Sequence, residues 1–200
     1  MRLFIHVGLH KTGTTFLQRE IFPNIIKNNK NIDIISKESF SGDILNMHSL
    51  YKMFINRFTI LEHLHKLYPS AKIILGVREK SSWLDSLYRQ YIKQGGTLDY
   101  INWFDTVLNK DCLDTEKYIR VIKETFDDIF IYHFEELKKD TGKVIDDMCN
   151  FMGCNSIKFV NKKYNVGWND RQIALGRFLN KRRWAGNPRF WVDKLSGTGR

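Results

Sequence analysis

Cysteine is scarce in this sequence, and its arrangement excludes two common ways of stabilising a small protein. The 200 residues include three cysteines, Cys112, Cys149 and Cys154. An odd number leaves one unpaired in any disulfide framework, and the three do not form the paired Cys/His pattern of a zinc site. They are typical of reduced thiols in a cytosolic protein.

Long apolar segments are also missing. No apolar run is long enough to cross a bilayer, and Met1-Arg2 leads directly into a strand-like segment instead of a signal peptide. We therefore expect a cytoplasmic protein without a membrane span. Internal repeats, low-complexity tracts and linkers are absent too, so residues 1–200 are expected to form a single domain.

Acidic residues are outnumbered by basic ones. The chain has 32 Lys and Arg against 22 Asp and Glu, a net charge of +10, which favours anionic partners such as a nucleotide or an acidic glycan. Zinc-finger ligands, an RNA-recognition signature and a helix-turn-helix pattern are missing, so nucleic acid is not an expected partner. A non-enzymatic polyanion-binding protein is one alternative interpretation of this charge.

Short apolar segments alternate with segments of helical periodicity along the chain. Short runs that are mostly apolar are typical of parallel strands, which are buried on both faces. The alternation predicts an α/β fold, a three-layer sandwich with a central parallel sheet flanked by helices. Strands are expected near 2–7, 32–36, 72–77 and 129–133, and helices near 14–29 with a break at Pro23, 43–68, 82–94, 99–109, 114–126, 141–152 and 172–180.

The most informative motif lies between the first strand and the first helix. The chain there reads Lys11-Thr12-Gly13-Thr14-Thr15, a turn with one lysine, one glycine and adjacent hydroxyls. Gly13 lets the backbone approach an anion closely, and Lys11 supplies positive charge. The helix N-terminus adds unpaired N–H groups and the positive end of its dipole. The sequence therefore predicts a phosphate-binding loop, and the alternative is an ordinary strand-to-helix turn that contains these residue types by chance.

This loop differs from that of the nucleoside triphosphatases. Their pattern, G-x-x-x-x-G-K-[ST], places the lysine after the second glycine, whereas Lys11 precedes Gly13 by two positions. The strand near 72–77 ends in Arg78 and Glu79 and lacks an aspartate that could organise magnesium. We expect a nucleotide whose reaction needs no metal. A nucleotide-dependent phosphotransferase is the alternative.

A second anion site is indicated further along the chain. Arg78 follows a buried strand, at the end where ligands bind in open α/β sheets, and Ser86 lies eight residues later in a helix. The planar guanidinium can hold a phosphate with two hydrogen bonds, and the serine hydroxyl can add another. Alternatively, Arg78 pairs with Glu79 or a surface acid, and Ser86 is an ordinary helix-surface residue.

Together the two motifs resemble those of the sulfotransferases that use 3′-phosphoadenosine 5′-phosphosulfate (PAPS). The segment Lys11–Phe16 is similar to the family's 5′-phosphosulfate loop, usually P-K-S-G-T-T-W, and Arg78 with Ser86 is similar to its 3′-phosphate motif. A third likeness is Ile129–Leu137, followed by the helix over 144–152. The resemblance implies a P-loop NTPase-like fold and PAPS as co-substrate, without a metal.

The resemblance also implies which residues bind the nucleotide. Phe16 replaces the family's tryptophan, which stacks on adenine, and His10 stands where many members have proline. The family's glycine-rich C-terminal loop, which also holds the 3′-phosphate, is not recognisable. Any of Arg171, Arg177, Lys181, Arg182 and Arg183 could take its place. The implied nucleotide contacts are Lys11, Thr12, Gly13, Thr14, Thr15, Phe16, Arg78 and Ser86.

Catalysis needs charge stabilisation and a base. Lys11 is implied to stabilise the oxygen that bridges sulfur and phosphorus as the sulfuryl group leaves. Glu38, directly after the second strand, is the first candidate for the base, with His48 and His10 as alternatives. His6 alternates within the first strand and is expected to be buried and structural.

The acceptor and the oligomeric state are left open by the sequence. A hydroxyl or an amine would receive the sulfuryl group, and a glycan, a lipid, a small metabolite or a peptide tyrosine would each supply one. The glycine pair Gly95-Gly96, with Tyr88 and Arg89 nearby, is expected to flank the acceptor cleft. The aromatic segment Trp184–Trp191 is expected to pack on the core or to form a lid.

Overall fold

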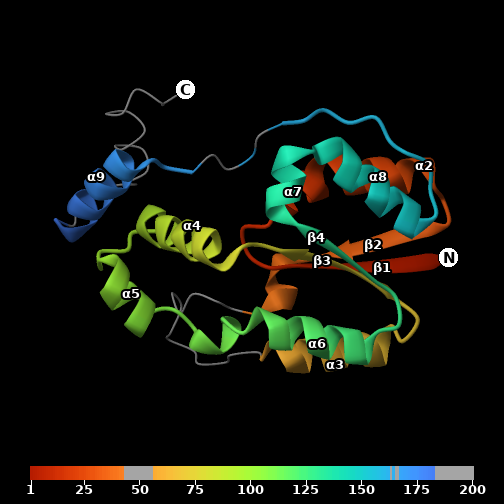
Figure 1. The fold of residues 1–200 in the computed structure, drawn as a ribbon, viewed down its shortest axis with the longest axis horizontal. Helices are drawn as coiled ribbons and strands as arrows, with labels where there is room; N and C mark the ends of the chain where they lie inside the picture. The colour runs from red at the N-terminus through yellow and green to blue at the C-terminus, as the bar shows by residue number, and fades with distance from the viewer. Residues whose placement is uncertain (43–55, 163, 165–166, 183–200) are drawn as a thin grey trace. The chain divides into compact units, whose positions relative to one another are not determined.

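The computed structural model describes residues 1–42, 56–162, 164 and 167–182 (Figure 1). Tertiary contacts divide the chain into two compact units. The sheet unit comprises Met1–Glu79 and Asn109–Tyr164, and the helical unit comprises Lys80–Leu108 and Asn165–Arg200. The expectation of one domain over residues 1–200 stays a prediction.

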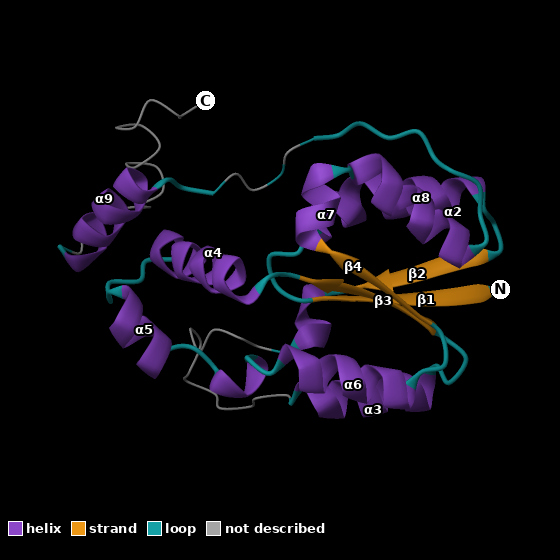
Figure 2. Cartoon of the chain, viewed as in Figure 1, coloured by secondary structure: helices purple, strands orange, loops and turns teal. Residues whose placement is uncertain are grey.

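The sheet unit contains four parallel strands in the order β2-β1-β3-β4 (Figure 2). They are β1 (Arg2–Gly8), β2 (Ile32–Ser36), β3 (Lys72–Val77) and β4 (Ile129–His133), which confirms the predicted strands. The chain continues from β1 to β2 on one side, whereas β3 pairs with the other side of β1. The strand order therefore reverses at β1, and ligands of open α/β sheets bind at the carboxyl ends beside such a reversal.

Helices cover both faces of this sheet, as predicted. In Figure 2, α2, α7 and α8 lie over one face, and α3 and α6 lie over the other. Their bounds are Phe22–Asn28 for α2, Arg57–Leu67 for α3, Thr115–Thr125 for α6, Phe134–Lys139 for α7 and Thr141–Met152 for α8.

The bounds of α8 follow from local capping. The side chain of Asp140 accepts a hydrogen bond from the N–H of Lys143 at 3.0 Å, and Gly153 ends the helix in the left-handed conformation with φ 64°. Between these caps, Ile145 and Met148 are fully buried against the sheet residue Phe4 in the main core cluster. This burial fixes which face of α8 meets the sheet.

The helical unit consists of α4 (Lys80–Lys93), α5 (Tyr100–Thr106) and α9 (Asp170–Lys181). The side chain of Asn180 on α9 donates to the carbonyls of Ile92 at 2.9 Å and of Gly96 at 2.7 Å. These two bonds tie α9 to the end of α4 and to the glycine pair that follows it.

Several predicted helices have different bounds. The helix expected over 14–29 begins as α1 (Thr14–Phe16), continues as a π-helical turn over Leu17–Ile21 and ends as α2. The irregular part of this helix precedes Pro23. Pro23 itself fits in the first turn of α2, because the N–H groups of a first turn make no hydrogen bond within the helix and proline lacks only that group. The helix α5 is shorter than the expected 99–109, and α7 lies where the sequence predicted no helix.

Of the helix expected over 43–68, the structure describes residues 56–68, and Arg57–Leu67 of these form α3. Residues 43–55, which include His48, and the aromatic segment Trp184–Trp191 lie outside the described residues. None of the described helices combines the length and the apolar character that crossing a bilayer requires.

Candidate functional site

The predicted phosphate-binding loop lies between β1 and α1, at the reversal of strand order. The N–H of Leu9 donates to the carbonyl of Gly76 on β3 at 3.0 Å, which holds the start of the loop against the neighbouring strand. The hydroxyl of Thr12, which is fully buried, donates to the carbonyl of Leu9 at 2.6 Å and closes the turn. The Thr12 hydroxyl thus has a structural partner within the loop.

Gly13 provides the N-cap of α1 in the left-handed conformation, with φ 89°. A Cβ atom at this position would lie 2.9 Å from a methyl carbon of Leu137 on α7, so both the backbone angle and the space favour glycine. The carbonyl of Gly13 accepts from the N–H groups of Phe16 and Leu17 at 2.9 and 3.2 Å, which starts the helix.

Thr14 is the residue of this loop whose side chain most clearly indicates a ligand. It is 5 % exposed, and its Oγ1 atom has no hydrogen-bond partner among the described residues. A Cβ atom on Gly8 would lie only 2.8 Å from this oxygen, so glycine at the end of β1 is required to admit the hydroxyl. A buried polar atom without a hydrogen-bond partner lowers the stability of the folded protein by about 1–3 kcal/mol. An anion bound in the loop would give the Thr14 hydroxyl such a partner.

The next two loop residues differ in burial. Thr15 is half-buried at the start of α1. Phe16 is 8 % exposed, belongs to the main core cluster and packs edge-on against Phe159 with ring centroids 6.0 Å apart. The expected stacking of Phe16 on adenine stays a prediction.

Lys11, Arg78 and Glu38 meet at one turn of the chain. The guanidinium of Arg78 donates to the carbonyl of Lys11 at 3.0 Å, and the N–H of Lys11 donates to Oε1 of Glu38 at 3.3 Å. Burial lowers the pKa of the Lys11 ammonium, the positive charge of Arg78 lowers it further, and the Glu38 carboxylate opposes both effects. The site thus gathers two cations and one carboxylate from three separate segments.

Arg78 also contacts two residues of α7. Its guanidinium carbon lies 4.5 Å from the centre of the Phe134 ring, and its Nε lies 4.0 Å from Oε1 of Glu135. The alternative interpretation, in which Arg78 pairs with a surface acid, is therefore partly correct, because Glu135 is such a residue. The same side chain nevertheless reaches the phosphate-binding loop.

Two of the three candidate bases lie at this turn. Glu38 begins a 3-10 turn over Glu38–Ser41 directly after β2. The hydroxyl of Ser41 donates to the carbonyl of Glu38 at 2.9 Å and lies 3.3 Å from Nδ1 of His10. His10 and Glu38 are thus neighbours through Ser41. The third candidate, His48, is not among the described residues.

A buried polar network behind the loop was not predicted from the sequence. His6 is fully buried, and its ring nitrogens lie 2.8 Å from the hydroxyl of Ser36 and 3.1 Å from that of Tyr132. The hydroxyl of Tyr132 donates to the carbonyl of Thr12 at 3.2 Å, and Gln18 donates to Ser36 Oγ at 3.0 Å. Burial lowers the pKa of His6 to about 3.

These contacts assign the tautomer of His6. Because the Tyr132 hydroxyl donates to the loop, it accepts from His6, which therefore carries its proton on Nε2 and accepts from Ser36 on Nδ1. The prediction that His6 is buried and structural is confirmed. Its structural role is to connect β2 and β4 to the phosphate-binding loop.

The remaining predicted contacts belong to the helical unit. Ser86 is half-buried on α4, and Arg171, Arg177 and Lys181 lie on α9, with Arg182 directly after it. Arg78 belongs to the sheet unit and Ser86 to the helical unit, so their joint grip on one phosphate stays a prediction. Arg183 lies outside the described residues.

Comparisons with known proteins agree with this fold. A family model described as a sulfotransferase domain matches residues 27–154. The crystal structure of a sulfotransferase from Alicyclobacillus acidocaldarius is 14% identical with a TM-score of 0.60, and the alignment covers 100% of this chain and 97% of that chain. This likeness confirms the predicted P-loop-like α/β fold.

The crystal structure of mouse sulfotransferase SULT7A1 complexed with PAP is 17% identical, with a TM-score of 0.48 and coverage of 94% of this chain and 69% of that chain. A search of curated proteins found no match.

Proposed function

This chain belongs to the sulfotransferase domain family, whose model matches residues 27–154, and on that premise we propose that its sulfuryl donor is PAPS. The acceptor is a hydroxyl or an amine, as a glycan would offer. The family match begins at residue 27, after the phosphate-binding loop. The geometry of the loop is therefore a separate observation in favour of the proposal.

The single observation that supports the nucleotide most strongly is the Thr14 hydroxyl. It is buried at the start of a helix without a partner among the described residues, in the same loop as the Lys11 ammonium. Helix N-termini, backbone N–H groups and a lysine together favour a phosphate or a phosphosulfate. The 5′ end of PAPS provides this chemistry.

In the proposed reaction the acceptor atom attacks sulfur in line with the leaving oxygen. A bond from the acceptor to sulfur forms while the bond from sulfur to the bridging oxygen breaks, and its electron pair stays on the 5′-phosphate. The Lys11 ammonium stabilises this charge, and the lowered pKa of Lys11 makes it a better proton donor to that oxygen. Arg78 orients the loop through the Lys11 carbonyl.

Glu38 is the proposed base, because its carboxylate lies at the same turn as Lys11. We expect Glu38→Gln to lower kcat by at least about a hundredfold, as loss of a general base typically does, while KM for PAPS changes little. His10→Ala is the matched comparison, because His10 lies next to Glu38 through Ser41. An unchanged kcat in Glu38→Gln together with a large loss in His10→Ala would move the role to His10.

The proposal is tested by a thermal-shift titration with 3′-phosphoadenosine 5′-phosphate, run beside ADP and ATP with magnesium. A ligand at 100 times its dissociation constant stabilises the folded state by about 2.7 kcal/mol, which is several degrees in Tm. A shift specific to the 3′-phosphorylated nucleotide without metal supports the proposal. No shift, or a preference for ATP with magnesium, contradicts it and favours a phosphotransferase.

A further inference from the structure

A cavity of about 500 Å³ lies within the helical unit. It is lined by α4, by α5 with the residue that precedes it, and by α9. Charged and aromatic side chains dominate its wall. The residues on which the argument rests are Asp85, Tyr88, Arg89, Tyr100, Asp170 and Arg177.

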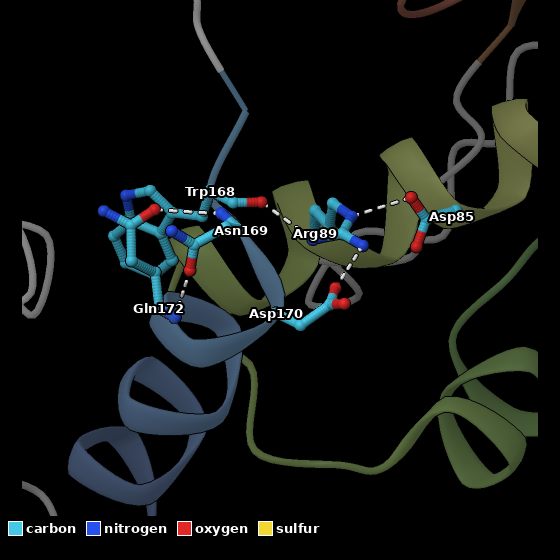
Figure 3. A network of polar contacts seen from close by, with 6 residues as sticks. All are labelled: Asp85, Arg89, Trp168, Asn169, Asp170 and Gln172. Carbon is cyan, nitrogen blue, oxygen red and sulfur yellow. Dashed lines mark hydrogen bonds and ion pairs between the residues drawn. The ribbon is translucent and has the colours of Figure 1, made fainter.

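One part of the wall is a fixed ion-pair network around Arg89 (Figure 3). The guanidinium donates to Asp85 at 2.7 Å, to Asp170 at 2.6 Å and to the carbonyl of Trp168 at 2.7 Å. The side chains of Asp85 and Asp170 are nevertheless 54% and 91% exposed. Each carboxylate therefore keeps lone pairs that can accept a hydrogen bond from a ligand. The ion pairs with Arg89 fix the orientation of both carboxylates before a ligand binds.

The cavity is close to electrical neutrality. Hydrogen bonds from Asn102 lower the pKa of Asp99, and the charge of Arg177 lowers it further. The lining residues thus include three carboxylates, at positions 85, 99 and 170, and two guanidinium groups, at positions 89 and 177, which leaves one net negative charge. This balance disfavours a phosphate, a sulfate ester or an acidic sugar as the ligand.

The aromatic part of the wall is rigid and partly open. Tyr100 is 39% exposed, and its ring is held by Tyr88 at 5.3 Å and by Trp103 at 5.4 Å between centroids. A fixed aromatic face binds an apolar surface at low entropic cost, because few rotamers are lost. A purely apolar ligand such as a lipid chain would cover the exposed carboxylate oxygens of Asp85 and Asp170 without offering them a hydrogen bond.

We propose that this cavity binds an uncharged sugar ring of the acceptor, either a neutral sugar or an N-acetylated amino sugar. The C–H face of the ring packs on Tyr100, its hydroxyls donate to Asp85 and Asp170, and they accept from Arg177. The assignment to the acceptor rests on the proposed function, and it makes the substrate class a glycan of neutral or N-acetylated amino sugars.

The test measures binding of three trisaccharides to the full chain by isothermal titration calorimetry. The probes are neutral cellotriose, the N-acetylated amino sugar chitotriose and acidic trigalacturonate. Cellotriose or chitotriose should bind more tightly than trigalacturonate. No binding of either sugar, or a preference for trigalacturonate, would overturn the inference.

Variants locate the sugar in the cavity. Tyr100→Ala should weaken binding by about tenfold, the effect of losing one aromatic contact, and Ala174→Trp, which fills the cavity from an exposed helix position, should abolish it. Phe178→Ala is the matched control, because Phe178 is 48% exposed on the same unit but does not line the cavity. Unchanged affinity in both cavity variants would overturn the inference.

A parallel titration with 3′-phosphoadenosine 5′-phosphate separates this inference from the proposed function. Nucleotide binding without sugar binding overturns the sugar site and leaves the donor proposal standing. Sugar binding that depends on Tyr100, without nucleotide binding, supports the cavity as a carbohydrate site and overturns the donor proposal.

Discussion

At Lys11 the backbone has a φ of 67°, in a region that residues other than glycine rarely adopt. Such a conformation costs of order 1–3 kcal/mol and persists only where surrounding contacts enforce it. Here Arg78 binds the carbonyl of Lys11 and Glu38 accepts from its N–H. The strained residue and its two restraints are the residues proposed to perform or support the reaction.

We predict that Lys11→Ala abolishes turnover while the protein stays folded. The half-buried ammonium is the proposed stabiliser of the leaving oxygen, and loss of such a donor lowers kcat by about 10²–10³-fold. Lys37→Ala removes the same charge from an exposed position next to Glu38 and is the matched control. Steady-state kinetics check this, and turnover of Lys11→Ala equal to that of the control would refute the mechanism.

Thr14→Val gives a prediction in which stability and binding change in opposite directions. Valine has nearly the shape of threonine and removes a buried oxygen that has no partner among the described residues, so the ligand-free protein should gain up to about 1 kcal/mol. Affinity for 3′-phosphoadenosine 5′-phosphate should fall by about tenfold. Urea unfolding and calorimetry measure the two effects.

Thr12→Val is the matched comparison for Thr14→Val. The Thr12 hydroxyl donates to the carbonyl of Leu9 within the loop, so its loss should destabilise the free protein by about 1 kcal/mol. If Thr14→Val instead destabilised the free protein as much as Thr12→Val, the Thr14 hydroxyl would have an internal partner. The argument for a ligand at this position would then fail.

At the scale of elements, the loop is positioned by the strand that leads into it and by strands that follow it many residues later. His6 on β1, Ser36 at the end of β2 and Tyr132 on β4 form one hydrogen-bonded chain that ends at the Thr12 carbonyl. A Cβ atom at Gly76 on β3 would clash with the Tyr132 hydroxyl, so glycine at this position leaves room for the network. All four strands therefore take part in holding the loop.

The His6 network predicts a loss of stability in acid. Burial lowers the pKa of His6 from 6.5 to about 3, so between these values the unfolded chain binds a proton that the folded protein does not. The free energy of unfolding should therefore decrease as the pH falls below 6.5, by up to about 1.4 kcal/mol per pH unit from this residue. Urea unfolding at a series of pH values measures the slope.

His6→Gln is the control for this prediction. Glutamine does not titrate, so the slope between about pH 6 and 4.5 should be smaller than in the wild type, whatever the absolute stability of the variant. Equal slopes in the two proteins would show that His6 does not couple proton binding to folding.

At the scale of the whole molecule, the two compact units are proposed to bind ligands of different charge. The sheet unit presents Lys11 and Arg78 in a chain of net charge +10, whereas the cavity of the helical unit has nearly balanced charges. A charged nucleotide and an uncharged sugar depend differently on ionic strength. This difference can be measured without altering the protein.

We predict that nucleotide affinity decreases as salt increases and that sugar affinity does not. Raising sodium chloride from about 0.05 to about 0.5 M shortens the screening length from roughly 14 to 4 Å and should weaken binding of 3′-phosphoadenosine 5′-phosphate. Cellotriose or chitotriose should bind with a nearly constant Kd. Calorimetric titrations at both salt concentrations check this, and a nucleotide Kd independent of salt would contradict it.

The sequence alone determined the features that depend on neighbours a few residues apart. The four strands follow from short apolar runs, and the bounds of α8 follow from Asp140 and Gly153, because periodicity and capping act within one or two turns. The turn between β1 and α1 likewise follows from the short segment around Gly13, and its binding of a phosphate stays a prediction. The interactions that set these features act between residues close in the sequence, which is why the features could be predicted.

Only the tertiary structure decided which distant side chains meet. Tyr132 contacts His6 across 126 positions of the sequence, and Arg89 contacts Asp170 across 81. The sequence around Tyr132 or Arg89 contains no local pattern that predicts these partners. The same holds for the absence of a partner at Thr14 among the described residues and for the burial of Phe16. Such contacts depend on strand register and helix packing, which place side chains only after the chain has folded.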